Sequence, residues 1–354
     1  MNKFDLDTPA LLLDRDKLER NIRRMADWAR RNHVAVRPHF KVHRTPQISQ
    51  MQMEAGAIGI TCAKLGEAEV LIEHGILDIL IAYEIVGPKI PRLCDLAARS
   101  RLIALVDNPE VVRAMAAAAR ERGVVIDLLV DVDVGMARCG VQSVQEAIEM
   151  GRLIAQQEGL RLRGLAAYEG HLGHLAPSPE KNQKIRACLE PLAEIQAAWA
   201  AEGLETDIVS AAGTGTFYDS GPLPFLTEIQ AGTYAMNDLL YHGAGSDFEF
   251  AMTVLTLVVS RRPGTLICDA GMKALHPAFG PSQPLGHPEL HPRGLSAEHG
   301  AYDIEGETDL QVGDKFEIIP YYADGTINLF TQWHVVRGDE FVEIWPIAAH
   351  GRSQ

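Results

Sequence analysis

Short apolar runs alternate with helical segments through the first two thirds of the chain. The intervening segments place apolar residues at helical spacing, and several begin after Asp, Asn or Ser and end in Gly, as helix capping requires. The apolar runs, which favour β-strands, are VAVRPHF, AIGITCA, ILDILIAY, RLIALVD, VIDLLVDV, RGLAAYEG, TDIVSAAG and LTEIQAG. Eight strands that alternate with helices over roughly 220 residues predict a (β/α)8 TIM barrel.

The other fold with this alternation is a doubly wound open sheet. That fold carries a glycine-rich fingerprint in its first strand-to-helix turn, where it binds a dinucleotide. Here the first turn reads HFKVHR and contains no glycine. The barrel is therefore the favoured interpretation.

The pattern changes near Phe248, after which β-type runs predominate. FAMTVLTLVVSRR, GTLICDAG, DKFEIIPYY and INLFTQWHVVRGDEFVEIWPI are separated by Gly, Pro and Asp turns, with no long helical segment between them. These runs predict a smaller all-β domain, and the early run ALLLD, which precedes the barrel, is expected to join it. We therefore assign residues 15–245 to the barrel, and residues 1–14 and 246–354 to the β domain.

Composition narrows the kind of partner. The net charge of −14 argues against nucleic acid, because phosphate backbones are bound by basic surfaces. No apolar run reaches the length of a membrane span, and the N-terminal MNKFDLDTPA lacks the apolar centre of a signal peptide. The 5 cysteines are scattered and form no CxxC pair, which is typical of reduced thiols. We expect a cytoplasmic protein that acts on a small molecule.

Polar residues collect where the predicted strands end, and in a barrel this edge carries the active site. Lys41, in RPHFKVHR, follows the first strand, and Arg138, in DVDVGMARCG, follows the fifth. The sixth strand ends in AYEGHLGHL, which contains Tyr168, His171 and His174. Histidine is a natural proton shuttle near neutral pH. Solvated loops, a surface arginine paired with neighbouring acids, and a pair of metal-binding histidines are the alternatives left open.

Glycine-rich turns follow the last two strands, where barrels commonly bind phosphate. The first turn, SAAGTGTF, offers backbone that can approach an anion closely and two hydroxyl donors. Its residues of interest are Gly213, Thr214, Gly215 and Thr216. The second turn, QAGTYAMND, adds the phenol of Tyr234. A lysine together with a phosphate site suggests pyridoxal 5′-phosphate held by Lys41 as a Schiff base, and the alternative is a sugar-phosphate aldolase that uses this lysine directly.

These motifs resemble those of the fold-type III pyridoxal-phosphate enzymes, the alanine-racemase-like group, and within it the D-threonine aldolase and D-serine dehydratase family. The similarity runs nearly from end to end and includes DTPALLLD, RPHFKVHR, GMARCG, GTGT, AGTYAMND, DAGMKAL, AEHG and IIPYYADGTINL. The resemblance implies that Lys41 binds the cofactor, that Arg138 contacts its ring, and that the two glycine-rich turns hold its phosphate. It also implies a homodimer.

The turn after the sixth strand, YEGHLGH, is closer to the aldolases of that family than to its dehydratases. The resemblance implies that Tyr168 and His174 flank the substrate, with Tyr168 also beside the cofactor and His174 as the base on the β-hydroxyl group. We therefore expect cleavage of D-β-hydroxy-α-amino acids, of the D-threonine or 3-hydroxy-D-aspartate type, to glycine or a close amino acid plus an aldehyde. A D-serine or 3-hydroxyaspartate dehydratase, an amino-acid racemase and a non-catalytic pyridoxal-phosphate carrier remain the alternatives.

One segment departs from the family pattern. The family's metal motif reads Pro-x-His-x-Cys or Pro-x-His-x-Asp, whereas this chain has PYYADGTINL, with Tyr322 in place of the histidine and Asp324 retained. A phenol is a poorer ligand than imidazole for Mn²⁺, Mg²⁺ or Zn²⁺ at neutral pH. Two outcomes stay open: weak binding of Mg²⁺ or Mn²⁺ through Asp324, or no metal, with His174 and Tyr322 handling the hydroxyl group.

Overall fold

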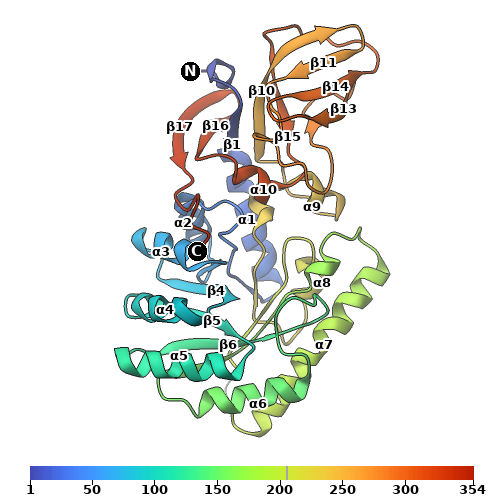
Figure 1. Ribbon diagram of the computed structural model, residues 1–354. Helices are drawn as coiled ribbons and strands as arrows, with labels where there is room; N and C mark the ends of the chain where they lie inside the picture. Colours follow the sequence, from blue (N-terminus) through green and yellow to red (C-terminus); the bar gives the residue numbers. More distant parts are fainter. Residues whose placement is uncertain (205) are drawn as a thin grey trace. The chain divides into compact units, whose positions relative to one another are not determined.

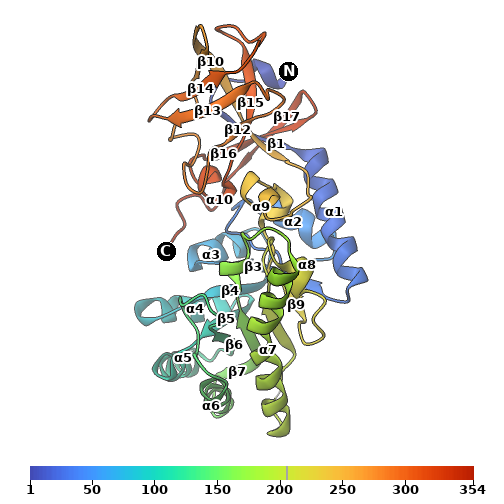
Figure 2. The same ribbon diagram turned by 90° about the vertical axis from the view of Figure 1, so that its right-hand side faces the viewer.

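The computed structural model describes residues 1–204 and 206–354. The chain folds into two compact units, which we call the barrel unit and the β unit (Figure 1 and Figure 2). The barrel unit consists of Met25–Lys41, Ile48–Gly232 and Gly351–Gln354. The β unit consists of Met1–Arg24, Val42–Gln47 and Thr233–His350. Segments distant in the sequence therefore meet within each unit.

In the barrel unit, the described residues form one sheet of eight parallel strands, in the order β2-β9-β8-β7-β6-β5-β4-β3. The two ends of this order are joined, because the N–H of Phe40 donates to the carbonyl of Thr61 (2.7 Å) and the N–H of Thr61 donates to the carbonyl of Pro38 (2.9 Å). The strands are β2 (Ala35–Val36), β3 (Ile60–Cys62), β4 (Asp78–Glu84), β5 (Arg101–Val106), β6 (Ile126–Val132), β7 (Leu160–Ala167), β8 (Ile208–Ala211) and β9 (Glu228–Ile229). This closure excludes the open sheet and confirms the predicted barrel.

Helices alternate with the strands, and α3 to α7 lie on the outer side of the sheet (Figure 1). Of these, α5, α6 and α7 begin after an Asn or Ser side chain that accepts backbone N–H groups, as the sequence predicts. At the start of α5, the side-chain oxygen of Asn108 accepts the N–H of Glu110 (2.8 Å), and at its end Gly123 takes a φ of 64°. The helices are α1 (Arg15–Arg31), whose second half belongs to this unit, α2 (Pro46–Glu54), α3 (Leu65–Glu73), α4 (Ile90–Ala97), α5 (Pro109–Arg122), α6 (Val144–Ala155), α7 (Pro179–Ala201), α8 (Phe217–Ser220), and the 3-10 turns η2 (Gly87–Lys89) and η3 (Gly170–Leu172).

The strands of the barrel unit are fixed by an apolar cluster. Its buried members, which come from five neighbouring strands, are Leu80, Ile103, Leu105, Leu129, Ala166 and Ile208. Burial of each Leu or Ile side chain stabilises the fold by about 1.5–3 kcal/mol, so the cluster makes a rigid support for the loops that leave the strand ends.

The β unit contains a second sheet, with nine strands among the described residues. The main order is β13-β14-β11-β10-β1-β16-β17, while β15 pairs with β10 and β12. The N-terminal strand β1 is antiparallel to β10 and parallel to β16. The strands are β1 (Ala10–Asp14), β10 (Met252–Arg262), β11 (Thr265–Cys268), β12 (Gln283–Pro284), β13 (Leu290–Leu295), β14 (Gly300–Ile304), β15 (Lys315–Ile319), β16 (Gln332–Arg337) and β17 (Glu340–Pro346).

Short helices interrupt this sheet, and one of them corrects the strand pattern. The sequence pattern predicts a strand over the run INLF, but Ile327 ends a helix and β16 begins only at Gln332. The cause is a cap from a distant residue, because the carboxylate of Asp238 accepts the N–H of Ala323 (2.8 Å) at the first helical position. The short helices are η1 (Lys3–Asp5), η4 (Thr233–Ala235), α9 (Leu239–Gly243) and α10 (Ala323–Ile327).

Candidate active site

Lys41 lies at the edge of the barrel where the parallel strands end. β2 ends at Val36, but the chain remains paired with β3 as far as Phe40, so Lys41 leaves the sheet at its C-terminal edge. Its side chain is half-buried, and its backbone N–H donates to Nδ1 of His39 (3.4 Å). The amine thus follows a strand end as the sequence pattern indicates, while its role toward a cofactor stays a prediction.

Arg138 and Tyr168 are brought together from the loops after β6 and β7. The guanidinium carbon of Arg138 lies 5.8 Å from the centre of the Tyr168 ring, within the range of a cation–π contact. The loop before Arg138 is fixed by Asp133, whose Oδ1 accepts the N–H groups of Gly135 (2.9 Å) and Ala137 (3.1 Å). A cation and an aromatic ring therefore sit side by side at the barrel edge.

The turn of residues 212–216, which we call the glycine turn, follows β8 and packs against the loop after β7. A Cβ atom on Gly213 would lie 3.0 Å from Cε2 of Tyr168, and one on Gly215 would lie 1.9 Å from the carbonyl oxygen of Gly173. Both glycines are therefore needed for loop packing, a role that the sequence analysis missed because the contacting residues come from another loop. Thr214 and Thr216 are buried.

The two histidines of the loop after β7 differ in their surroundings. His171 packs on the loop after β6, since a Cβ atom on Gly135 would lie 3.1 Å from its Cε1. His174 is exposed at the surface of the barrel unit. Both histidines are thus exposed, and His171 in addition lies against the loop after β6.

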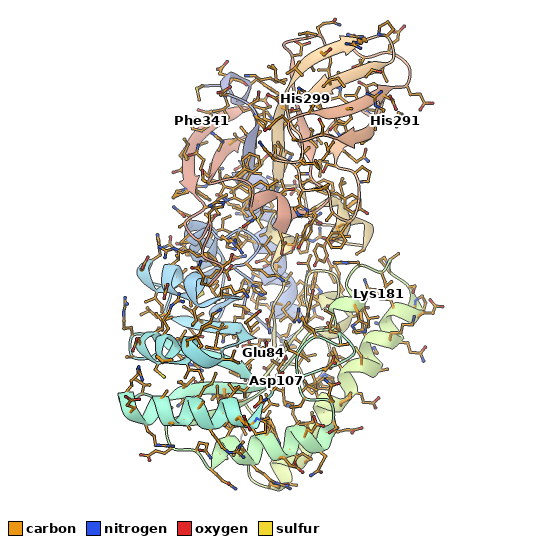
Figure 3. The ribbon with its side chains drawn as sticks, in the orientation of Figure 1. Glu84, Asp107, Lys181, His291, His299 and Phe341 are labelled. Carbon is orange, nitrogen blue, oxygen red and sulfur yellow. The ribbon has the colours of Figure 1, made fainter. Side chains whose placement is uncertain are left out.

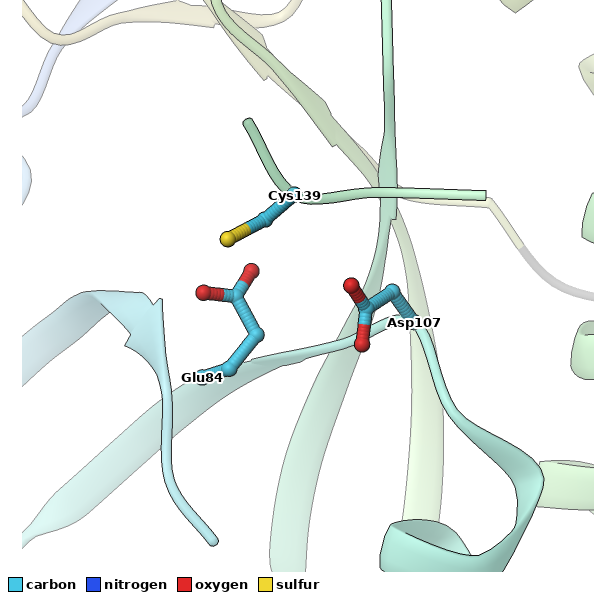
Figure 4. A group of neighbouring side chains, drawn as sticks. All are labelled: Glu84, Asp107 and Cys139. Atoms are coloured by element: carbon cyan, nitrogen blue, oxygen red, sulfur yellow. The ribbon is translucent and has the colours of Figure 1, made fainter. Parts of the chain in front are cut away.

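An acidic group that the sequence analysis did not select lies at the ends of β4 and β5 and in the loop after β6. Ligand atoms of Glu84, Asp107 and Cys139 lie within 4.8 Å of one another (Figure 4). Figure 3 shows Glu84 and Asp107 near each other in the barrel unit. Both acids stand at the end of an apolar run, in ILDILIAYE and RLIALVD, and this position is the signal that could have revealed them.

Burial raises the pKa of one member of this group, Cys139, and of Asp131 beside it. Burial and the neighbouring carboxylate of Glu84 raise the pKa of Asp131 to about 8. Burial and a hydrogen bond with Glu84 raise the pKa of the Cys139 thiol to about 11. Metal ions bind deprotonated donors, so the raised pKa of the Cys139 thiol disfavours a metal at this group.

Tyr234 belongs to the β unit, in η4. It is 1% exposed, and its ring centre lies 5.4 Å from that of Phe248. Its side chain is therefore part of the core of this unit, and its contact with a cofactor phosphate stays a prediction.

The altered metal motif also lies in the β unit. Tyr322 directly precedes α10, and Asp324 lies in the first turn of that helix. The Tyr322 ring packs near those of His276 and Phe279, at centre distances of 5.6 and 5.0 Å. Nδ1 of His276 accepts the N–H of Ala278 (3.3 Å), so this nitrogen is already used within the protein.

These residues do not make up the metal site that the family motif implies. Among the described residues, Asp324 belongs to no group of three His, Cys, Asp or Glu side chains that could share an ion, and the acidic group of the barrel unit is the one such group. A single carboxylate holds Mg²⁺ only with much help from water or substrate. The donor set therefore does not fit a firmly bound metal.

Comparison with known proteins shows to which family this chain belongs. The family model described as "Alanine racemase, N-terminal domain" matches residues 13–238, and the "Putative serine dehydratase domain" matches residues 251–336. The chain belongs to the alanine racemase N-terminal domain family. The resemblance found in the sequence is thereby confirmed for the family.

Relatives within this family cover the chain almost completely. The crystal structure of a D-threonine aldolase from Filomicrobium marinum is 38% identical, with a TM-score of 0.96, and covers 99% of this chain and 97% of that chain. A D-threonine aldolase from Arthrobacter sp. is 35% identical over 99% of this chain and 94% of its own length. A 3-hydroxy-D-aspartate aldolase from Paracoccus denitrificans (strain Pd 1222) is 32% identical over 100% of this chain and 94% of its own length. In the described parts of this family member, no helix has both the length and the apolar character needed to cross a bilayer.

Proposed function

We propose that this chain is a pyridoxal-phosphate-dependent lyase that cleaves D-β-hydroxy-α-amino acids to glycine, or a close amino acid, plus an aldehyde. The observation that carries the proposal is the similarity, over 99% of the chain, to the structure of a D-threonine aldolase. Such coverage extends over both the barrel unit and the β unit. Substrates of the D-threonine or 3-hydroxy-D-aspartate type are the proposed class, in line with the names of the relatives.

The chemistry of the barrel edge fits pyridoxal 5′-phosphate. Lys41 would supply the amine for the cofactor's aldehyde, and Arg138 and Tyr168 would contact its ring. The glycine turn, with Gly213, Thr214, Gly215 and Thr216, would hold the phosphate together with Tyr234. When bound, this cofactor withdraws electrons from Cα of the amino acid, so that a bond to Cα can break heterolytically.

Two residues of this chain move the protons of the cleavage. His174 takes the proton of the β-hydroxyl group as the Cα–Cβ bond breaks, and the oxygen electrons form the aldehyde carbonyl. The electron pair of the broken bond passes to Cα, where Lys41 delivers a proton to complete the glycine. One proton is removed and one is returned, so the step is balanced. Tyr168 flanks the substrate on the same loop as His174.

No step of this scheme runs through a metal ion, because the residues around Asp324 do not fit one. Any divalent ion, Mg²⁺ or Mn²⁺, would have Asp324 as its protein carboxylate and water or substrate oxygens as its other ligands. We also propose that the enzyme works as a homodimer in the cytoplasm, which sedimentation of the purified protein and cell fractionation can test.

A product assay decides between the reaction classes. Purified holoenzyme is incubated with D- and L-isomers of threonine, 3-hydroxyaspartate and serine, and the aldehyde, ammonia and stereochemistry of the amino acid are measured. Aldehyde plus glycine from a D-isomer is the expected result, and Lys41→Ala serves as the inactive control. Ammonia plus an oxo acid would identify a dehydratase, inverted stereochemistry a racemase, and no product from any substrate a non-catalytic carrier.

A further inference from the structure

Glu169 is a buried acid that the reaction scheme above does not use. It stands between Tyr168 and Gly170 in the loop after β7, and it is 0% exposed. Burial of a carboxylate is costly unless hydrogen-bond donors compensate for the lost water, so the partners of Glu169 indicate what it does. These partners lie in the glycine turn and in α8.

The carboxylate of Glu169 joins the ends of the glycine turn and of the short helix that follows it. Its Oε2 accepts the N–H of Ala212 (3.3 Å), the first residue of the turn, and its Oε1 accepts the hydroxyl of Ser220 (2.6 Å), the last residue of α8. Ala212 has a φ of 67°, a conformation that residues with a Cβ atom rarely adopt. The hydrogen bond from its N–H therefore stabilises the turn at its most strained residue.

The same loop is tied to the glycine turn and α8 at further points. The carbonyl of Gly173 lies against Gly215, as described above. Nζ of Lys181, a buried lysine at the start of α7, donates to the carbonyl of Leu175 (2.7 Å) (Figure 3). The next residue, Asn182, donates through Nδ2 to Asp219 of α8 (2.7 Å). The stretch between Glu169 and Leu175, which contains His174, is thus fixed at both ends against one substructure.

We propose that Glu169 is a positioning residue that holds the glycine turn and the loop of His174 in one arrangement, so that cofactor retention and placement of the base depend on the same buried carboxylate. This inference rests on the proposed function, since it takes the glycine turn as the phosphate site and His174 as the base. Glu169 itself touches neither the cofactor nor the substrate in this scheme.

The test compares Glu169→Ala with Glu169→Gln. The alanine variant leaves the N–H of Ala212 and the hydroxyl of Ser220 without their acceptor, whereas the glutamine oxygen can still accept from Ala212. Glu190→Ala, which removes an exposed glutamate of α7, is the matched control. The readouts are the Kd for pyridoxal 5′-phosphate, and kcat and KM at saturating cofactor.

Glu169→Ala is expected to raise the cofactor Kd and to lower kcat by about tenfold or more each, the effect of losing one hydrogen bond to a charged group. Glu169→Gln should recover most of both losses, and Glu190→Ala should stay within about twofold of the wild type, as surface changes usually do. Should Glu169→Ala fail to fold, Ser220→Ala, which keeps the carboxylate and removes one donor, is expected to move both quantities in the same direction by a smaller factor.

A change in thermal stability alone, or in only one of the two quantities, would overturn the inference, because a merely structural role predicts that pattern. The wild type serves as the check on the underlying function. If borohydride fixes the cofactor on wild-type Lys41 and Glu169→Ala behaves like the wild type, the inference alone fails. If the wild type retains no cofactor on Lys41, the proposed function is wrong, and the inference, which rests on that function, is wrong as well.

Discussion

A buried ion pair at the start of the barrel strands gives the sharpest prediction about stability. Nε of Arg37 donates to both carboxylate oxygens of Glu228 (3.0 and 3.2 Å), and each side chain is only 2% exposed. Ser210 donates its hydroxyl to Glu228 (2.8 Å), and Arg37 also pairs with Asp78. The pair therefore joins β9 and β8 to the chain that leads from β2 to Lys41.

Replacement of Arg37 by methionine leaves a shorter, unbranched apolar side chain and removes the charge. Glu228 is then left as a buried carboxylate with a hydroxyl donor but no cation, and breaking a buried pair in this way typically costs about 3–5 kcal/mol. The matched control is Arg101→Met, which pairs with the same Asp78 (2.9 Å) from a side chain that is 46% exposed. Exposed pairs contribute about 0–1 kcal/mol, so the control should change stability little.

Hydrogen exchange of the amides in β2 and β9 is the suitable assay, because it reports opening of the barrel strands and does not require two-state unfolding of both units. Arg37→Met should lower the opening free energy by several kcal/mol more than Arg101→Met. Adding Glu228→Leu to Arg37→Met should recover much of the loss, since replacing both partners of a buried pair by apolar groups is often neutral. Equal effects of the two arginine changes would refute the reasoning.

Four further outcomes follow from the site. Borohydride reduction of the holoenzyme should fix pyridoxal phosphate on Lys41, as read by peptide mass, because this amine lies at the barrel edge. His174→Gln should leave cofactor binding unchanged and slow cleavage by about 10²–10⁴, the usual contribution of a general base, as measured by aldehyde release. Exhaustive chelation should remove any bound ion without unfolding the protein. In a metal titration, Tyr322→His should bind Mg²⁺ or Mn²⁺ beside Asp324 more tightly than the wild type does. The folded-state pKa of Asp131 is about 8 against an ordinary 3.8, so the unfolded chain loses this proton at lower pH than the folded chain does. The stability that protonated Asp131 contributes should therefore be fully present below about pH 4 and decline as pH rises to about 8. Thermal unfolding across this range should show the decline in the wild type and not in Asp131→Asn.

Each of these outcomes can fail in a distinct way. Labelling at Lys64 or Lys273 would move the cofactor site, and full activity of His174→Gln would transfer the role of base to His171. His291→Gln, at an exposed histidine of β13, controls for the loss of a surface imidazole. A Zn²⁺ ion that resists chelation in the wild type would show a ligand set other than the one around Asp324. A pH dependence of stability unchanged in Asp131→Asn would assign the titration to another group.

The segment RPHFKVHR shows what the sequence could predict and what it could not. Its apolar residues predicted a strand end, and Lys41 lies at that end. The role of Arg37 was hidden, because its partner Glu228 lies 191 positions away. His43, which is 0% exposed, turns inward in the β unit and accepts the N–H of Thr45 at Nδ1 (3.2 Å). Local periodicity thus predicts where the chain runs, whereas burial of a charged or polar side chain depends on distant partners.

The glycine turn also shows that local sequence predicts the position of a segment but not its distant contacts. Gly213 and Gly215 were interpreted as positions of close approach to an anion, and the turn is indeed placed after a barrel strand. The structure adds a second requirement, because Tyr168 and the carbonyl of Gly173 occupy the space that side chains would need. Residue type and spacing predicted the turn, but only the fold shows that it forms a unit with the loop that carries His174.

The charge of the chain also needs a local explanation. A net charge of −14 would disfavour an anionic cofactor and an amino-acid carboxylate, yet salt screens charges beyond about 8 Å at physiological ionic strength, so nearby groups decide. Near Arg138, burial and the proximity of Glu84 raise the pKa of Asp131 to about 8 and that of the Cys139 thiol to about 11. A proton held by Asp131 removes one negative charge near Arg138, so the guanidinium is less offset as a local positive charge for an anion. Above about pH 8 this carboxyl ionises, and the local field at Arg138 weakens.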